Sequence, residues 1–328
     1  MSSIQEPIRI ILPNHFDGST VNAWLFVEPE PILVDCGMLT EDSWNALVRG
    51  IRQNGLEMGD ISKLIITHGH ADHMGMANKV AEESQCEVWI PEYLLDWAID
   101  LGTQLRQRDR IYRDVFNSHT DNDLYQLEDY SNMLLKVWEP ISKDRLRVFD
   151  NDAVLKIGLH EWQTFYTPGH CINQVVFYQP EYQQLISGDM ILNRTPVPYP
   201  DAGIGNDQVR CQSLRLLLNS YKTISKLKIQ HVYPGHFEIM GCPEKLIQKQ
   251  VNRIELNIQK CFAWIHEGIH DFETIIQKLY PKRINDSTFF MTIAILDFLV
   301  YEKKVESRII NKKSTYFPIR ESVLSSTS

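Results

Sequence analysis

Three histidines and an aspartate stand within six residues of the segment "ITHGHADHMGMAN", namely His68, His70, Asp72 and His73. A hydrophobic core tolerates such groups only when they are paired. Imidazole and carboxylate are the ligands that zinc takes when one coordination position must stay open for water. Two histidines two residues apart on a turn can reach one ion. The aspartate and histidine that follow point elsewhere, so they can reach a second ion.

Three more candidate ligands stand singly: His170 in "TPGH", Asp189 in "SGD" and His236 in "PGH". A glycine beside each of them lets the backbone turn sharply. His170 would complete a set of three with the first two histidines of the cluster, and His236 would join the other two cluster residues. Asp189 is then the natural bridging carboxylate. Two ions roughly 3.5 to 4 Å apart would hold a hydroxide between them.

The surrounding sequence predicts elements that bring these residues together. The segments "KLIITHGHADH", "WQTFYTPGH", "QLISGD" and "IQHVYPGH" each begin as an apolar strand and end in one of the polar motifs. Helical patterns alternate with the strands, for example in "DSWNALVRGIRQNGL" and over residues 208–226. Loops at the strand ends of a layered α/β protein therefore carry the site.

A helical insertion over residues 93–145 interrupts this alternation. Its stretches are amphipathic, and Trp97, Leu101 and Leu105 recur every four residues. We expect Trp97 to serve mainly in helix packing, with the floor of a substrate pocket as the second interpretation. An insertion of this kind could cover the cleft as a lid and select the substrate.

The pattern changes again after Gly241. Apolar residues from Ile247 to Ile265 form a long helical stripe, which we expect to be core or a face for homodimerisation. Two shorter helices and the alternating tail "KKVESRIINKKSTYFPI" follow, so three helices and a hairpin resemble a winged-helix module. We therefore predict two domains, over residues 1–242 and 243–328.

Composition argues against several classes of protein, namely nucleic-acid binders, membrane proteins and disulfide-rich secreted proteins. The 328 residues carry a net charge of −9, which argues against a general nucleic-acid binder, although the segment from Glu244 onward carries +3. No apolar run reaches the roughly 18 residues of a membrane span. The first residues do not resemble a signal peptide, and the six cysteines form no CxxC pair. We expect reduced thiols and a cytoplasmic protein without a membrane partner.

The order D … HxHxDH … H … D … H resembles the metallo-β-lactamase superfamily, and the resemblance covers residues 8 to about 240. It implies an αβ/βα four-layer sandwich, hydrolysis, and two divalent metal ions, usually zinc, although the same ligands also suit iron or manganese. It also implies a structural role for Asp35, in "VDCG", which would support the metal loops. The ligand sets implied by motif match are His68, His70 and His170 for the first metal, and Asp72, His73 and His236 for the second, with Asp189 as the bridge.

A narrower resemblance is to the branch called β-lactamase-like protein 2, which pairs this fold with a C-terminal winged helix. The segment "SGDMILNRTPVPYP" resembles that branch after the bridging aspartate. Some members of the branch cut RNA, and most have no assigned substrate.

These observations favour a dinuclear hydrolase in which a metal-bridging hydroxide attacks an acyl carbon. The catalytic residues would be Asp189 and Asp72, the latter orienting the hydroxide or relaying its proton. The motifs contain no additional acid to protonate a departing amine, so a thioester, ester or lactone is favoured over a β-lactam. The small-molecule acyl substrate would meet Arg194 and Tyr199, which could bind an anionic group. Arg194 could equally form a surface salt bridge, and we expect Cys171 to be a packed thiol.

Two other functions stay open. A metal-dependent endoribonuclease would use the same ions on a phosphodiester, and the branch resemblance and the basic C-terminal segment support it. The negative total charge and the lack of an aromatic and basic stripe oppose it. A non-enzymatic scaffold that binds a partner through its C-terminal module is the third hypothesis, and the intact ligand set opposes it.

Overall fold

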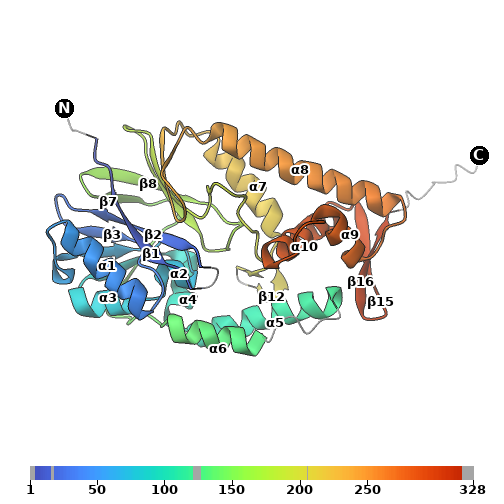
Figure 1. Cartoon of the computed structure of the whole chain (residues 1–328), viewed down its shortest axis with the longest axis horizontal. Coiled ribbons are helices and arrows are strands. Elements are labelled where there is room, and N and C mark those ends of the chain that lie inside the picture. Colours follow the sequence, from blue (N-terminus) through green and yellow to red (C-terminus); the bar gives the residue numbers. More distant parts are fainter. Residues whose placement is uncertain (1–3, 16–17, 121–126, 205, 320–328) are drawn as a thin grey trace, which may run out of the picture.

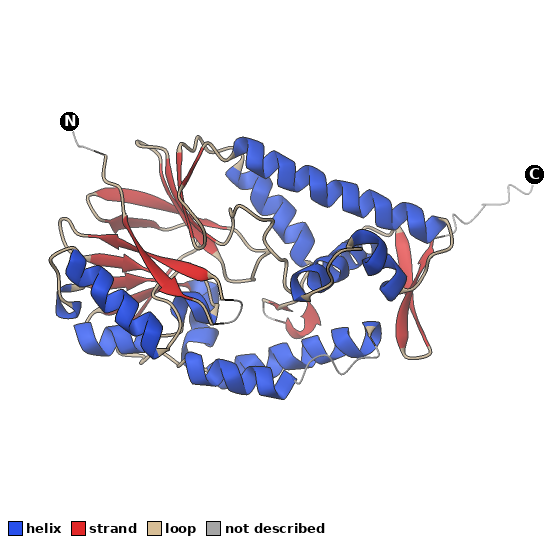
Figure 2. Cartoon of the chain, viewed as in Figure 1, coloured by secondary structure: helices blue, strands red, loops and turns tan. Residues whose placement is uncertain are grey.

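Two six-stranded sheets form the centre of the computed structural model, which describes residues 4–15, 18–120, 127–204 and 206–319 (Figures 1 and 2). The first sheet has the strand order β1-β2-β3-β4-β5-β6 and the second β14-β13-β10-β9-β8-β7. The strands of the first sheet are β1 Ile8–Pro13, β2 Thr20–Phe26, β3 Ile32–Val34, β4 Lys63–Ile65, β5 Glu87–Pro91 and β6 Leu146–Phe149. Those of the second are β7 Val154–Ile157, β8 His160–Tyr166, β9 Val175–Gln179, β10 Gln184–Gly188, β13 His231–Pro234 and β14 Met240–Gly241.

The inner faces of the sheets pack against each other through a cluster of large apolar side chains. Trp24 and Phe26 of β2 meet Trp162, Phe177 and Tyr233 of the second sheet, and all five are buried. Burial alternates along β8, where Trp162 points inward between exposed neighbours, as expected of a strand with one buried face. Strands β9 and β10 are buried throughout because helices cover their other face.

Helices cover the outer face of each sheet, which completes a four-layer αβ/βα sandwich (Figure 2). The helices before the second sheet are α1 Glu41–Gln53, η1 Met58–Asp60, α2 Ala71–Met74, α3 Ala77–Ser84, η2 Glu92–Leu94, α4 Leu95–Ile99, α5 Leu101–His119 and α6 Leu127–Val137. The later ones are α7 Ser213–Ile224, α8 Glu244–His266, α9 Phe272–Leu279 and α10 Asp286–Tyr301. Two short hairpins complete the chain: β11 Ala202–Gly203 with β12 Asn206–Arg210, and β15 Val305–Ile310 with β16 Lys313–Pro318. No described helix has the length and hydropathy needed to cross a membrane.

The expected insertion contains helices α4, α5 and α6. Leu101 and Leu105 of the predicted stripe are buried, and Trp97 is half-buried and stacked on Trp138, with ring centroids 5.5 Å apart. Figure 1 shows α5 and α6 side by side, with α5 running from the sandwich to the C-terminal helices.

The C-terminal segment consists of three helices and a hairpin, as the periodicity predicted. Its described apolar side chains belong to a larger core that it shares with other helices. One apolar cluster joins Ile254 of α8 and Ile295 of α10 to Val115 of α5 and to Leu217 of α7. The insertion and the C-terminal segment are thus held together by shared packing.

Two details of the predicted secondary structure are wrong. The helix expected over 208–226 begins at Ser213, because residues 206–210 pair with β11 in a hairpin. The strand β6 was not predicted, since "LRVF" is short and exposes two of its four residues. Both segments obtain their structure from a neighbouring strand, which local periodicity does not reveal.

Candidate metal centre

The predicted ligands converge at the ends of strands from both sheets. The cluster follows β4, while His170, Asp189 and His236 follow β8, β10 and β13. Three groups of side chains present ligand atoms within 4.8 Å of one another: His68 with His70 and His170, His68 with His73 and Asp189, and Asp72 with His73 and His236. All seven side chains that the motifs singled out therefore lie in one cluster.

Asp35 organises the first half of the cluster. It is buried, and its backbone φ is +59°. One carboxylate oxygen accepts a hydrogen bond from the amide of Thr67, and the other accepts from the Thr67 hydroxyl and lies 2.8 Å from His73 Nδ1. His73 must therefore carry its proton on Nδ1, which leaves the lone pair of Nε2 directed into the cluster. This is the arrangement expected of a residue that orients a metal ligand.

Hydrogen bonds to the Nδ1 atom also fix the orientation of three other histidine rings. Thr67 gives its only hydroxyl proton to Asp35, so it accepts from His68 Nδ1 at 3.0 Å. His170 Nδ1 lies 3.0 Å from the carbonyl of Val197, and His236 Nδ1 lies 2.7 Å from the carbonyl of Thr20. A carbonyl can only accept, so both rings donate through Nδ1. Their Nε2 atoms therefore face the cluster, where each lies 3.3 Å from Asp189 Oδ2.

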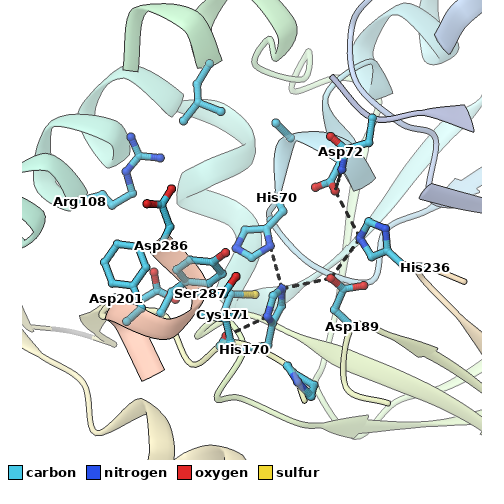
Figure 3. Close-up of a pocket in the computed structure, with 18 of the residues that line it drawn as sticks. His70, Asp72, Arg108, His170, Cys171, Asp189, Asp201, His236, Asp286 and Ser287 are labelled. Carbon is cyan, nitrogen blue, oxygen red and sulfur yellow. Dashed lines mark hydrogen bonds and ion pairs between the residues drawn. The ribbon is translucent and has the colours of Figure 1, made fainter. Parts of the chain in front are cut away.

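Asp189 lies between the two groups of histidines. Its Oδ2 atom is 3.3 Å from His170 Nε2 and 3.3 Å from His236 Nε2. Its Oδ1 atom is 3.5 Å from His73 Nε2. In Figure 3 its carboxylate stands between His170 and His236. This is the position from which one carboxylate can reach ions on both sides.

The donor set fits a pair of cations. His73 Nε2 and Asp189 Oδ1 are buried and make no hydrogen bond within the described structure, although they face each other. His70 Nδ1 lies 3.2 Å from His68 Nε2 and 3.0 Å from His170 Nε2, so three ring nitrogens crowd together. Buried polar atoms rarely stay unpaired. A metal ion bound by these lone pairs would satisfy them at once.

The pKa values of the ligand side chains show which of them are charged. Burial lowers the pKa of His68 and brings that of His70 down to about 3, so both rings are neutral, as ligation requires. Burial disfavours the charged form of Asp189, but His236 and His73 outweigh it and hold the pKa of this carboxyl well below its ordinary value. Burial also disfavours the charged forms of His73 and His236, but the nearby carboxylates, Asp189 first, outweigh it and raise the pKa of both rings. The cluster thus combines two neutral imidazoles, His68 and His70, with two protonated ones that are paired to ionised carboxylates, and a bound cation would displace those protons.

The cluster opens into a cavity of about 490 Å³, within the range of small-molecule sites. One side is formed by ligands, which we call the metal wall: His70, Asp72, His170, Asp189 and His236. The other side comes from α5, α6 and α10, and we call it the helical wall: Arg108, Tyr112, Tyr130, Met133, Leu134, Asp286, Ser287 and Phe290. Trp97 also lines the cavity, so it stands where its second interpretation placed it.

The two predicted substrate contacts both line the cavity. The ring of Tyr199 lies 5.7 Å from that of His70 and 5.6 Å from that of His170. The guanidinium of Arg194 lies over the ring of Phe237 at 5.3 Å. Cys171 is buried with its Sγ 3.2 Å from Asn173 Oδ1, and burial raises the pKa of this thiol, as expected of a packed cysteine.

Sequence reasoning missed several residues that hold the site. Thr67 and Asn14 contact the ligand set directly, since Asn14 donates to Asp72 Oδ2 at 2.8 Å. Asn173 accepts from the amide of Gly69 at 2.9 Å and so fixes the turn between the first two histidines. Arg108 was missed because it lies in the helical insertion, in a run of charged residues that reads as a solvated face. Thr67 could have been found from the sequence, because it stands immediately before the cluster.

A family model described as "Metallo-beta-lactamase superfamily" matches residues 16–236. This chain belongs to that superfamily. The chain is 22% identical over 317 residues to the "Probable metallo-hydrolase YqjP" of Bacillus subtilis, covering 92% of this chain and 95% of that protein. It is 25% identical over 109 residues to the chicken "Acyl-coenzyme A thioesterase MBLAC2", covering 33% of this chain and 37% of that protein.

Solved structures agree with the fold. A metallo-beta-lactamase family protein of Thermus thermophilus, TTHA1429, superposes with a TM-score of 0.78 at 20% identity, over 96% of this chain and 99% of that one. A beta-lactamase domain protein of Burkholderia ambifaria gives a TM-score of 0.74 at 19% identity, over 97% and 94%. Both matches extend across the C-terminal segment. The chain is thus a metallo-hydrolase of this superfamily.

Proposed function

We propose that this protein hydrolyses acyl thioesters or related activated esters with two divalent metal ions, most simply zinc. The observation that carries the proposal is the cluster itself, in which five imidazoles and two carboxylates converge beside one cavity. When bound, the two ions would lower the pKa of a water molecule and polarise the scissile carbonyl. His68, His70 and His170 would hold one ion, Asp72, His73 and His236 the other, and Asp189 would bridge them.

The chain's own residues then position the substrate and the ligands. Asn14 and His236 fix the Asp72 carboxylate, whose Oδ2 lies 3.4 Å from His236 Nε2 and lines the cavity. Asp72 and Asp189 are therefore placed to accept a proton from a water molecule within the cluster. Tyr199 and Arg194 line the approach to this point and would contact the acyl group or its carrier.

The chemistry of the leaving group favours a thioester over an amide as the bond that is hydrolysed. A thiolate departs without an added proton, whereas an amine must be protonated as it leaves. The partial similarity to an acyl-coenzyme A thioesterase supports this choice. The apolar and aromatic lining, which includes Trp97, Leu134 and Phe290, suits an acyl group.

We also infer that the C-terminal segment is a winged-helix-like unit, as in the β-lactamase-like protein 2 branch, built over residues 243–328. Its three helices and terminal hairpin support this. Its role in the proposed function is to complete the substrate cavity, since Asp286, Ser287 and Phe290 of α10 line it.

The test is thiol release from hexanoyl-CoA by zinc-loaded full-length protein. Asp189→Ala should lose at least one of two bound metals, measured by elemental analysis, and nearly all turnover, while the exposed control Asp114→Ala keeps both. Two metals per chain in Asp189→Ala would refute its bridging role.

Absence of thiol release from wild-type protein with both metals bound would overturn the acyl-hydrolase proposal. Cleavage of single-stranded RNA by the same preparation would then establish the endoribonuclease alternative. A protein that holds its metals and turns over none of these substrates would favour the scaffold hypothesis.

A further inference from the structure

Arg108 is a buried cation on the helical wall that the proposed reaction does not use. It lies in α5, is 9% exposed, and lines the cavity. Figure 3 shows it on the side of the pocket away from Asp72, Asp189 and His236, with His70 and Asp286 between. An arginine is almost never buried unless it is paired, so its partners need to be accounted for.

The guanidinium is held firmly on three sides. Its centre lies 5.4 Å from the ring of Tyr112 and 5.1 Å from that of Tyr130, so aromatic faces cover it from α5 and α6. Nη2 donates to Asp109 Oδ1 at 3.0 Å and to Ser131 Oγ at 2.8 Å. These contacts fix the orientation of the side chain before any ligand binds.

Two donor atoms of this fixed group are unused. Within the described structure Nε and Nη1 of Arg108 make no hydrogen bond, and Nε is fully buried. Five N–H donors in a planar fork are suited to carboxylate recognition. Because Nε has no exposed surface, Nη1 is the donor left for an acceptor oxygen of a ligand, and Arg108 lines the cavity.

Apolar and aromatic side chains make up much of the lining of the cavity, which includes Trp97, Trp138, Leu134, Tyr199 and Phe290. Asp286 stands between Arg108 and His70 in the view of Figure 3. An apolar chain would fill this cavity, with one end at the metal wall and the other at Arg108. The geometry therefore suits a molecule with a reacting carbonyl at one end and an acceptor group at the other.

Acidic groups also face this region. Asp109 is occupied by Nη2 of Arg108 and by the hydroxyl of Ser131. Burial raises the pKa of Asp201 to about 6, and its Oδ2 atom accepts a hydrogen bond from the amide of Ile172 at 2.9 Å. Asp286 is exposed and lies in the first turn of α10, where the helix N-terminus offsets its charge.

We propose that Arg108 determines specificity by binding a carboxylate at the far end of the acyl group, so that the preferred substrates are thioesters or esters of dicarboxylic acids. The inference rests on the proposed function. Hydrolysis would add water across the acyl–sulfur bond: the hydroxyl joins the acyl carbon at the metal wall, one proton of the water goes to the released thiol, and the new carboxylic acid loses its remaining proton to solvent.

The first experiment compares three CoA thioesters of one chain length: adipoyl, hexanoyl and 6-trimethylammoniohexanoyl. Wild-type protein should prefer adipoyl to hexanoyl by at least about tenfold in kcat/KM, mostly through KM, as expected for a charge-assisted pair. An equal rate for adipoyl and hexanoyl would overturn the inference. Preference for the cationic chain would overturn it too, because Asp286 and Asp201 would then dominate.

The second experiment tests the residue. Arg108→Met should reduce the adipoyl to hexanoyl ratio by at least about tenfold, and Arg108→Lys should restore part of it. Arg106→Met, two residues away on the exposed face of α5, is the matched control and should keep the wild-type ratio. A wild-type ratio in soluble Arg108→Met would refute the assignment, and the wild-type panel decides the carboxylate preference even if this variant does not fold.

A binding measurement separates this inference from the proposed function. Adipate and hexanoate are titrated into the zinc-loaded protein by calorimetry. Tighter binding of adipate, lost in Arg108→Met, supports the inference even if no thioester is hydrolysed. Thioester hydrolysis with equal binding of the two acids would leave the proposed function standing and overturn the inference.

Discussion

The metal wall and the helical wall of the cavity are built in different ways. Each ligand of the metal wall stands within a few residues of a strand end. Hydrogen bonds to Asn14 and to the carbonyls of Val197 and Thr20 orient Asp72, His170 and His236. The helical wall comes from α5, α6 and α10. Helix α10 begins 167 residues after α5 ends and meets it through apolar packing, while α5 and α6 share the hydrogen bond from Arg108 to Ser131.

This difference has consequences for what each wall can do. The metal wall resembles that of a whole superfamily because few strands and short loops define it. The helical wall depends on how an insertion and a C-terminal segment pack, so it is the part that can change the substrate while leaving the metal site intact. We expect chemistry to depend on the first wall and selectivity on the second.

Removal of the C-terminal segment should break the helical wall completely. A chain of residues 1–242 would expose Val115 of α5 and Leu217 of α7, both fully buried in the shared core. We expect this chain to be insoluble or to lack a cooperative thermal transition. A chain ending at residue 319 is the control and should melt like the full protein. Cooperative melting of the 1–242 chain would show instead that the segment is an independent domain.

Acid should weaken the contact between the insertion and the terminal hairpin. His119 of α5 lies 2.7 Å from the hydroxyl of Tyr316 in β16. Burial lowers its pKa to about 4, opposed by a bond to Val115 and reinforced by Arg210 and Lys313. The unfolded chain takes up this proton near pH 6.5, so the free energy of unfolding falls between about pH 6.5 and 4, by up to about 3 kcal/mol.

His119→Gln removes that titration while keeping a polar side chain. Chemical denaturation at pH 7 and pH 4.5 should show a smaller loss of stability on acidification than in wild type. The exposed His266→Gln is the matched control and should follow wild type. An unchanged pH dependence in His119→Gln would mean that this contact does not contribute to the acid sensitivity.

Asp35→Asn tests the metal-ligand cluster, through His73, with the smallest chemical change. Asparagine tolerates the left-handed backbone at this position. Its amide group would replace one acceptor oxygen with a donor, so either Thr67 or His73 loses its partner. We expect zinc affinity to fall by about 10- to 100-fold in a chelator competition titration, as for other residues that orient a ligand. The exposed Asp42→Asn should bind zinc like wild type, and equal affinity in Asp35→Asn would show that His73 needs no support.

Much of the metal wall could be predicted from the sequence because its ligands lie in short motifs that follow apolar strands. The cluster at 68–73 and the singly placed ligands come together as expected. Arg108 could not be predicted, because its burial requires Tyr130 of another helix and a cavity that no local pattern encodes. The strand β12 was missed for the same reason, since it exists only through pairing with β11.

The amino-acid sequence by itself determined the kinds of ligand, their order and the loops that hold them, since residue type and strand periodicity are local properties. Only the tertiary structure decided which imidazole nitrogen faces the cluster, because hydrogen bonds to the carbonyls of Thr20 and Val197 fix the tautomers. Tertiary packing also decided that α5 and α10 pack together to form one wall of the cavity. Such contacts depend on burial of apolar surface between segments distant in the chain, and that burial is a property of the folded molecule alone.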